Sequence, residues 1–260
     1  MRVCVLGHRG MLGHIVVRYF REQGCQVFTL KQRFMPDSAH YFLEQIQVAQ
    51  PDWCVNCIGV GPRQAVSREH LFEVNSLLPE LCAESLPPPV GFIQSSTDAV
   101  FEPFRPDRTS TDIPDAVDEY GLSKRHAESV MKGTNRYIIR CSIIGPELGI
   151  GHNLLNWFLA QTDCVPGYAN HYWNGITTLE WAKLCHGLIS GALSHVGSLL
   201  QPGVWPPVTK SELLTLIGEV WNHPVKIESV NADVPVTRTL VPNVVCPPLA
   251  AQLHDLRAWY

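Results

Sequence analysis

Short apolar segments alternate with amphipathic segments along the first half of this chain, and this order constrains the fold more than any other feature. The apolar segments are continuously hydrophobic, as expected for strands that are buried on both faces of a parallel sheet. The segments between them have the periodicity of helices. The order therefore predicts an α/β fold built on a doubly wound parallel sheet. The predicted strands are 2–6, 26–30, 53–58, 90–96 and 136–144, and the predicted helices are about 11–23, 38–49, 66–86 and 119–131.

The second half of the chain has a different rhythm, with short strands, separate helices and clusters of proline. We expect residues 1–145 to form the main domain and residues 146–260 a smaller mixed α/β C-terminal lobe. This lobe would pack over the open edge of the sheet and share a core with it. Its predicted helices are 153–161, 178–194, 210–222 and about 247–259, with strands near 197–201 and 225–230.

Composition excludes several classes of function. The chain has 260 residues, of which 45% are hydrophobic and 17% charged, with a net charge of -4, which suits a soluble globular protein. This balance gives no general attraction to nucleic acid or to a membrane, and no apolar run approaches the ~18 residues of a membrane span. The nine cysteines are scattered, and the pair in CVNC at 54–57 is interpreted as part of a buried strand. We therefore expect a cytoplasmic protein without a metal site.

A glycine-rich turn follows the first predicted strand. The sequence GHRGMLGH places Gly7, Gly10 and Gly13 between that strand and an amphipathic helix. Glycines in this position let the backbone approach a pyrophosphate, while the helix N-terminus offers free N–H groups. An ordinary loop is the alternative, but the strand before and the helix after favour a dinucleotide site. The first domain is thus predicted to be a Rossmann domain.

The end of the second predicted strand indicates which dinucleotide is bound. An acidic residue usually holds the ribose 2′-hydroxyl of NAD at this point. Here no acid precedes Asp37, and Lys31 and Arg33 stand in its place. Together with Arg9 in the glycine turn, these cations suit a 2′-phosphate, although they could equally be solvated surface charge. We expect NADP(H), with NAD(H) as the alternative.

A tyrosine and a lysine lie four residues apart near the start of a predicted helix. Tyr120 and Lys124, in YGLSK, share one helix face, and Thr97 and Asp98, in SSTDAVF, follow the preceding strand. A neighbouring ammonium lowers the pKa of a phenol, which makes tyrosine useful as an acid or base. Taken singly, the two residues could be a packed phenol and a solvated amine. Their order after the glycine turn favours a catalytic site.

With these motifs in this order, the chain resembles an extended short-chain dehydrogenase/reductase, and more closely the dTDP-4-dehydrorhamnose reductase group of sugar-nucleotide-modifying enzymes. Similar stretches, such as WCVNCIG, FEVNSLLPELC and WNGITTLEWAKL, extend over nearly the whole length. The resemblance implies that Tyr120 donates a proton, that Lys124 lowers its pKa and holds the nicotinamide ribose, and that Thr97 binds the substrate carbonyl. The family usually has an aromatic residue where Ala99 stands, which leaves the particular sugar open.

The resemblance also implies the contacts of the two ligands. For the cofactor they are Gly7, Gly10, Met11, Leu12 and Gly13 at the phosphates, Cys57, Ile58 and Gly59 beneath it, Ser95, and Asp37 near the adenine. Candidate substrate residues are Thr97, Asp98, Asn153, Trp157, Trp173 and Asn174, although buried aromatics in a lobe core would look the same.

The resulting hypothesis is an NADPH-dependent reductase of the 4-keto group of a nucleotide-linked deoxysugar, with a homodimer as a candidate assembly. One alternative is an epimerase or dehydratase of the same superfamily with tightly bound NAD. The other is a non-catalytic regulatory subunit that binds NADP.

Overall fold

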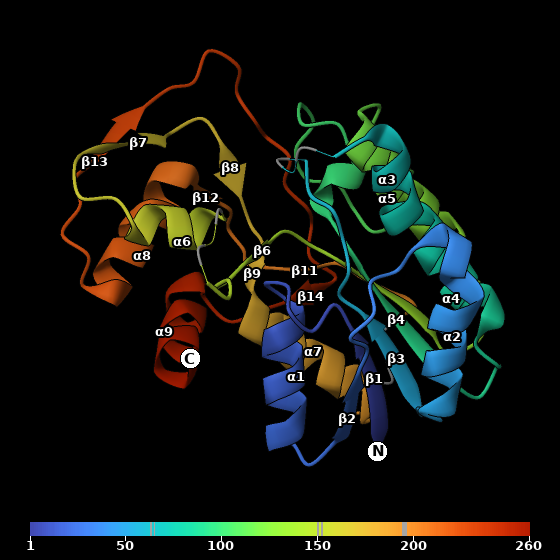
Figure 1. The fold of residues 1–260 in the computed structure, drawn as a ribbon. Coiled ribbons are helices and arrows are strands. Elements are labelled where there is room, and N and C mark those ends of the chain that lie inside the picture. Colours follow the sequence, from blue (N-terminus) through green and yellow to red (C-terminus); the bar gives the residue numbers. More distant parts are fainter. Residues whose placement is uncertain (63, 65, 150, 152, 194–196) are drawn as a thin grey trace.

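The computed structural model describes residues 1–62, 64, 66–149, 151, 153–193 and 197–260. Its centre is a parallel sheet of six strands in the order β10-β5-β4-β3-β1-β2 (Figure 1). The predicted doubly wound α/β fold is confirmed. The strands are β1 (Arg2–Leu6), β2 (Gln26–Thr29), β3 (Trp53–Asn56), β4 (Gly91–Ser96), β5 (Arg136–Arg140) and β10 (Leu199–Leu200).

Helices cover both faces of this sheet. On one face α1 (Gly13–Glu22) packs beside α7 (Thr178–Ile189), and their apolar sides meet the strands in one large core (Figure 1). The other face carries α2 (Ala39–Val48), α3 (Arg68–Phe72), the π-helical turn η2 (Glu73–Leu77), α4 (Leu78–Ser85) and α5 (Glu119–Ser129). Burial on both faces explains why the strands read as continuous apolar runs.

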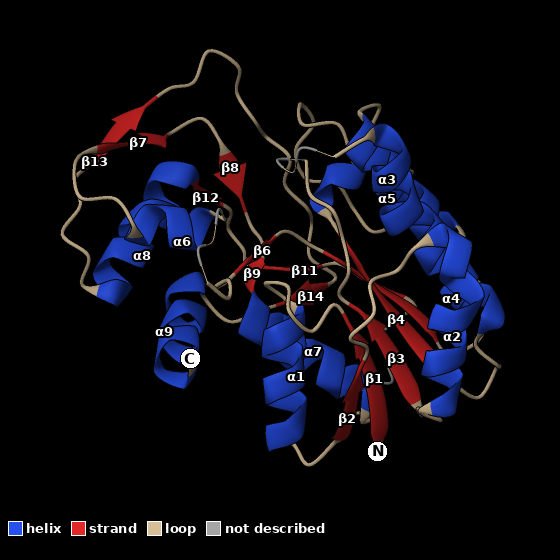
Figure 2. Cartoon of the chain, viewed as in Figure 1, coloured by secondary structure: helices blue, strands red, loops and turns tan. Residues whose placement is uncertain are grey.

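The C-terminal lobe has its own core among three helices. These helices lie at the side of the sheet (Figure 2). These are α6 (Leu154–Leu159), α8 (Lys210–Trp221) and α9 (Leu249–Trp259). Around them lie the short strands β6 (Ile143–Ile144), β7 (Val165–Tyr168), β8 (Tyr172–Trp173), β9 (Ile176–Thr177), β11 (Pro202–Gly203), β12 (Val208–Thr209), β13 (Ile227–Val230) and β14 (Val244–Val245).

Two elements from the second half of the chain are part of the central sheet and its helical layers. Helix α7 packs on α1, and β10 extends the central sheet beside β5. The predicted helix 178–194 ends at Ile189 in the structure, and residue 194 lies outside the described residues.

One strand prediction is wrong. The run 136–144 is not a single strand, because the chain leaves the sheet after Arg140 and pairs again as β6 with β9. The run is apolar throughout because both β5 and β6 are largely buried, although they pair with different strands. Nine cysteines are free, and in the described part of the chain no helix is long and apolar enough to cross a membrane.

The strand order places the candidate site. From β1 the sheet grows toward β2 on one side and toward β3 on the other, so the order reverses between β1 and β3. Ligands of doubly wound sheets bind beyond the carboxyl ends of the strands at such a reversal. The glycine turn follows β1 at this edge, and Thr97 follows β4 two strands away.

Candidate functional site

The glycine turn has the backbone geometry of a phosphate cradle. Gly7 adopts a φ of +80°, and the Gly10 amide donates to the Gly7 carbonyl at 2.9 Å. A Cβ on Gly13 would lie 2.1 Å from the Gly7 carbonyl oxygen, so no side chain fits there. Helix α1 begins at this point without a capping side chain or an acidic residue in its first turn. The turn therefore fits a pyrophosphate bound at a helix N-terminus.

The loop after β3 lies directly against this turn. A Cβ on Gly7 would meet the Ile58 amide nitrogen at 2.9 Å, and Cys57 and Gly59 flank that residue. The Asn56 side chain accepts a hydrogen bond from the Ile58 amide at 3.0 Å, which fixes the loop as it leaves the strand. The two predicted cofactor segments are thus brought together, with Met11 and Leu12 at the start of α1.

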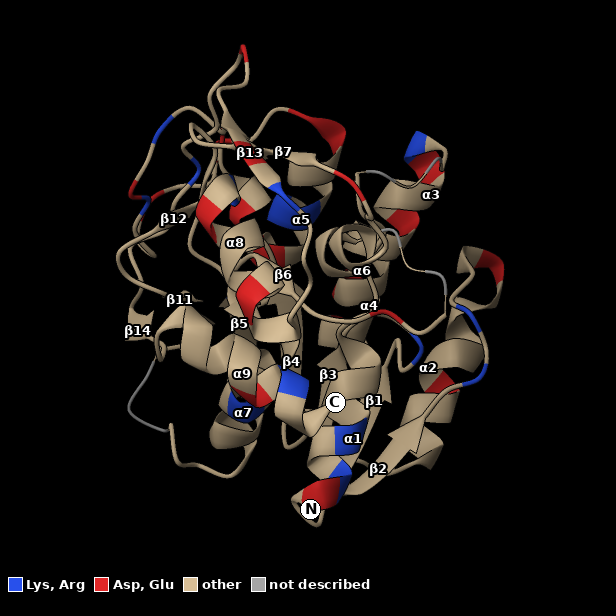
Figure 3. Cartoon of the chain, turned by 90° about the vertical axis from the view of Figure 1, so that its left-hand side faces the viewer, with Lys and Arg blue, Asp and Glu red and all other residues tan. Residues whose placement is uncertain are grey.

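The predicted cations lie on the surface near the same edge. Lys31 and Arg33 follow the end of β2 and are exposed, as is Arg9 in the glycine turn. Figure 3 shows basic positions on the loop that leads into α2. Asp37, expected near the adenine, is an exposed residue of the 3-10 turn Pro36–Ser38. This charge pattern suits a phosphate on the adenine ribose.

Thr97 and Tyr120 face each other across the junction of β4 and α5. Asp118 begins α5 by accepting the Gly121 amide at 2.9 Å, which places Tyr120 in the first turn. The Thr97 side chain is close enough to the Tyr120 phenol to lower its pKa. In this conformation the Thr97 hydroxyl donates to Asp98 at 3.0 Å and accepts from the Ala99 amide at 3.1 Å.

Lys124 lies one turn further along α5 and is almost fully buried, with 5% of its surface exposed. Its amine donates to the Ser95 carbonyl at 2.8 Å, so the lysine is anchored at the end of β4. Thr97, Tyr120 and Lys124 are therefore brought together at the end of β4. Ser95 joins them through its backbone.

Burial controls the charges of this group. It raises the pKa of Tyr120 to about 12, an effect opposed by Thr97 and Arg238 and reinforced by Asp98 and Asp118. Burial also lowers the pKa of Lys124 to about 8, opposed by Glu128. We expected Lys124 to lower the pKa of Tyr120. In the structure the lysine amine binds the Ser95 carbonyl instead, and burial of the phenol dominates.

Comparison with known proteins identifies the family of this chain. The model of the NAD dependent epimerase/dehydratase family matches residues 3–153. The chain belongs to this family. No curated protein sequence matches it.

Several solved structures share the whole fold. A dTDP-4-dehydrorhamnose reductase from Bacillus anthracis in complex with NADP superposes with a TM-score of 0.86 at 17% identity, covering 99% of each chain. A dTDP-4-dehydrorhamnose reductase from Clostridium acetobutylicum superposes with a TM-score of 0.82 at 16% identity, covering 100% of this chain and 99% of that one. A dTDP-glucose 4,6-dehydratase from Bacillus anthracis in complex with NAD gives 0.75 at 15% identity, covering 100% and 96%. At these identities the likeness establishes the fold.

The candidate substrate residues of this family member have mixed placements. Trp173 is buried in the lobe core and donates to Ser142 at 2.7 Å, while the Asn174 amide donates to the Leu240 carbonyl at 2.6 Å. Both polar groups are thus used inside the protein. Trp157 is exposed on α6. Asn153 caps α6 and also contacts the Met11 sulfur at 3.0 Å, which links the lobe to the cofactor turn.

Sequence reasoning missed Arg238. The adjoining Thr237 amide donates to the Pro103 carbonyl at 2.8 Å, and the Thr239 hydroxyl donates to Asp107 at 2.9 Å. These bonds hold the segment against the loop that follows the Thr97 turn. The Arg238 Nε atom is buried and has no hydrogen-bond partner among the described residues. No local pattern marks this arginine, because its neighbours lie more than 100 positions earlier in the chain.

Gly121, directly after the tyrosine, also shapes the site. A Cβ there would lie 2.5 Å from the Ala99 carbonyl oxygen and 2.4 Å from the Ala116 Cβ. The glycine therefore lets α5 approach the Thr97 turn closely enough for Tyr120 and Thr97 to meet. A glycine directly after the tyrosine is the available sequence signal for this close packing.

Proposed function

We propose that this protein is an NADPH-dependent reductase of the 4-keto group of a nucleotide-linked deoxysugar. The observation that carries the proposal is the meeting of Thr97, Tyr120 and Lys124 at the end of β4. The glycine turn beyond β1, with cations after β2, supports the choice of cofactor. The similarity in fold to dTDP-4-dehydrorhamnose reductases, one of them in complex with NADP, supports the substrate class.

The three side chains have the protonation states that ketone reduction needs. Bound NADPH would supply a hydride to the carbonyl carbon. Tyr120, with a pKa of about 12, is protonated at neutral pH and can deliver a proton to the carbonyl oxygen. Lys124, with a pKa of about 8, is mostly an ammonium ion there and stabilises the phenolate that remains. The Thr97 hydroxyl can hydrogen-bond the same oxygen, so the ketone becomes an alcohol.

Arg238 supplies a cation on the substrate side of the site. Its effect on the pKa of Tyr120, and an Nε without a hydrogen-bond partner among the described residues, support this role. A guanidinium in such a position suits the phosphates of a nucleotide-linked sugar. Lys31, Arg33 and Arg9 would serve the 2′-phosphate of the cofactor.

The alternatives have less support from this chain. A dehydratase of this superfamily is expected to follow its threonine with an acidic pair, but here Asp98 is followed by the buried Ala99. A regulatory subunit would keep the cofactor turn without turnover. The cytoplasmic location and the homodimer stay predictions, and size-exclusion chromatography with light scattering would test the latter.

Oxidation of NADPH, followed by its absorbance, tests the proposal against a panel of UDP-, dTDP-, GDP- and CDP-linked 4-keto sugars. We expect turnover with at least one of them, and Tyr120→Phe should lose it while binding of NADPH survives. Tyr41→Phe, on the exposed face of α2, is the matched control. Tightly bound NAD without net oxidation would favour the epimerase or dehydratase. Binding of NADPH without any chemistry would favour the regulatory subunit.

A further inference from the structure

Helix α5 contacts the end of β4 through residues on three successive turns. Positions 120, 124 and 128 lie one turn apart and share one face of the helix. Each of them meets one of three consecutive residues at the strand end: Ser95 meets Lys124, Ser96 meets Glu128, and Thr97 meets Tyr120. Glu128 thus has the same relation to the strand as the two catalytic candidates, although the proposed reaction gives it no role.

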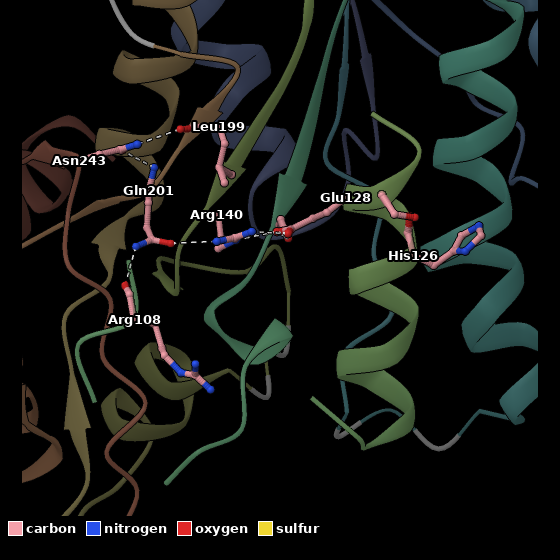
Figure 4. Close-up of polar contacts among 9 residues, drawn as sticks. Arg108, His126, Glu128, Arg140, Leu199, Gln201 and Asn243 are labelled. Atoms are coloured by element: carbon pink, nitrogen blue, oxygen red, sulfur yellow. Dashed lines mark hydrogen bonds and ion pairs between the residues drawn. The ribbon is translucent and has the colours of Figure 1, made fainter. Parts of the chain in front are cut away.

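Glu128 forms a buried ion pair. Its side chain is 7% exposed, and that of Arg140 on β5 is 3% exposed. The guanidinium makes two bonds to the carboxylate, at 2.9 Å and 2.6 Å, and the Ser96 hydroxyl adds a third at 2.5 Å (Figure 4). A buried carboxylate with three such donors is held in one geometry.

The same cluster reaches the segment that carries Arg238. Arg140 donates to the Gln201 side chain at 3.1 Å. The Gln201 amide in turn donates to the Arg108 carbonyl at 2.7 Å (Figure 4). It also donates to the Val241 carbonyl at 2.9 Å. Helix α5 is therefore joined through buried hydrogen bonds to the chain three residues beyond Arg238.

We propose that Glu128 is a positioning residue of the active site. Paired with Arg140, it fixes the register of α5 on the end of β4, and it supplies the negative charge one turn from the Lys124 ammonium. The catalytic part of this inference rests on the proposed function. The part that concerns Lys124 does not.

Among the acidic groups around α5, Glu128 is the one that raises the pKa of Lys124. Burial lowers the pKa of Lys124, and Glu128 is the group that opposes this effect. Two further acids near Lys124 have partners of their own: Glu119, at the start of α5, pairs with Arg68 of α3, and Glu80 of α4 pairs with His126. Asp98, Asp118 and Arg238 act on Tyr120 in the first turn of α5, Glu73 pairs with His70, and Arg140 pairs with Glu128.

Titration of the lysine Nζ signals by NMR in protein labelled with ¹⁵N-lysine tests the charge effect without turnover. Lys124→Arg assigns the signal. Glu128→Gln should move the midpoint of Lys124 to lower pH, whereas Glu128→Asp, which keeps the charge, should move it less. Glu80→Gln removes a carboxylate that also contacts α5 and is the matched control. Should Glu128→Gln fail to fold with an unpaired arginine, the double variant Glu128→Gln/Arg140→Gln removes both charges together. An unchanged midpoint in the folded variant would overturn the inference.

Kinetics with a ketone that the wild type reduces tests the positioning effect. Glu128→Gln should lower kcat by about tenfold to 10²-fold, because small displacements of reacting groups are costly, while KM for NADPH changes little. The alkaline limb of the kcat profile should move to lower pH together with the midpoint of Lys124. A loss of stability with kcat and this limb unchanged would show that the ion pair is only structural. If no ketone is reduced by the wild type, the proposed function fails, and the NMR titration still decides the role of Glu128.

Discussion

Replacing Lys124 by methionine should make the protein more stable while it abolishes turnover. Methionine has a similar length and no charge, so it can occupy the buried space beside β4. Lys124 is 5% exposed, and its amine binds only the Ser95 carbonyl among the described hydrogen bonds. Keeping a charge in such a place opposes folding, because the ammonium loses its hydration.

The size of this effect follows from the pKa. The value falls from 10.5 to about 8 on folding, which corresponds to about 3 kcal/mol of lost stability at neutral pH. Removing the amine also removes the hydrogen bond to the Ser95 carbonyl, which costs about 1 kcal/mol. The net gain should be about 2 kcal/mol, or roughly 4 to 8 °C in melting temperature for a chain of this size.

The dependence on pH separates this cause from a general packing effect. Between pH 8 and pH 10.5 the unfolded wild type binds more protons at this site than the folded protein, so wild-type stability rises with pH. The advantage of Lys124→Met should therefore be full below about pH 8 and should give way to a small disadvantage near pH 10.5, where only the loss of the hydrogen bond remains. Urea unfolding across this range measures it, with Lys132→Met as the control, since Lys132 is exposed just beyond α5. A variant that is less stable than the wild type at neutral pH, or an advantage that does not change with pH, would refute the reasoning.

Two further predictions concern the cofactor. Gly13→Ala should abolish binding of NADPH and lower the melting temperature, because the new Cβ would lie 2.1 Å from the Gly7 carbonyl oxygen; calorimetric titration and thermal unfolding measure the two effects. Lys31→Glu combined with Arg33→Glu should weaken binding of NADPH far more than binding of NADH. Equal losses for both cofactors, or no loss, would mean that these cations are surface charge.

The sheet, the glycine turn and the tyrosine motif could be predicted because each has a local signature. Strands buried on both faces read as apolar runs, and Gly7 and Gly13 mark backbone positions that tolerate no side chain. Even there, composition alone could not show that the run 136–144 leaves the sheet at Cys141, because both parts of the run are buried.

The contacts that complete the site had no such signature. Arg238 acts on Tyr120 because the segment 237–239 is hydrogen-bonded to the loop at 103–108. The sequence around Arg238 contains no motif that predicts this contact. The effect of Lys124 on Tyr120 was expected from spacing along the helix. Spacing fixes which residues share a face, but it does not decide whether the amine binds the phenol or the Ser95 carbonyl.

The contrast between local motifs and long-range contacts explains why the sequence defines the chemistry of the site better than its substrate. Tyr120, Lys124 and Glu128 lie on one helix that is locked to one strand end, and Gly121 sets their distance from Thr97. Such a unit depends on backbone contacts and can keep its geometry when the surrounding loops change. The groups that would select a sugar, with Arg238 foremost, lie instead on segments between short strands of the lobe. Exchanging the 231–243 segment with that of a relative should therefore change the preferred sugar nucleotide while the titration of Lys124 stays the same. A shifted Lys124 midpoint in such a chimera would show that the lobe helps to set the chemistry as well.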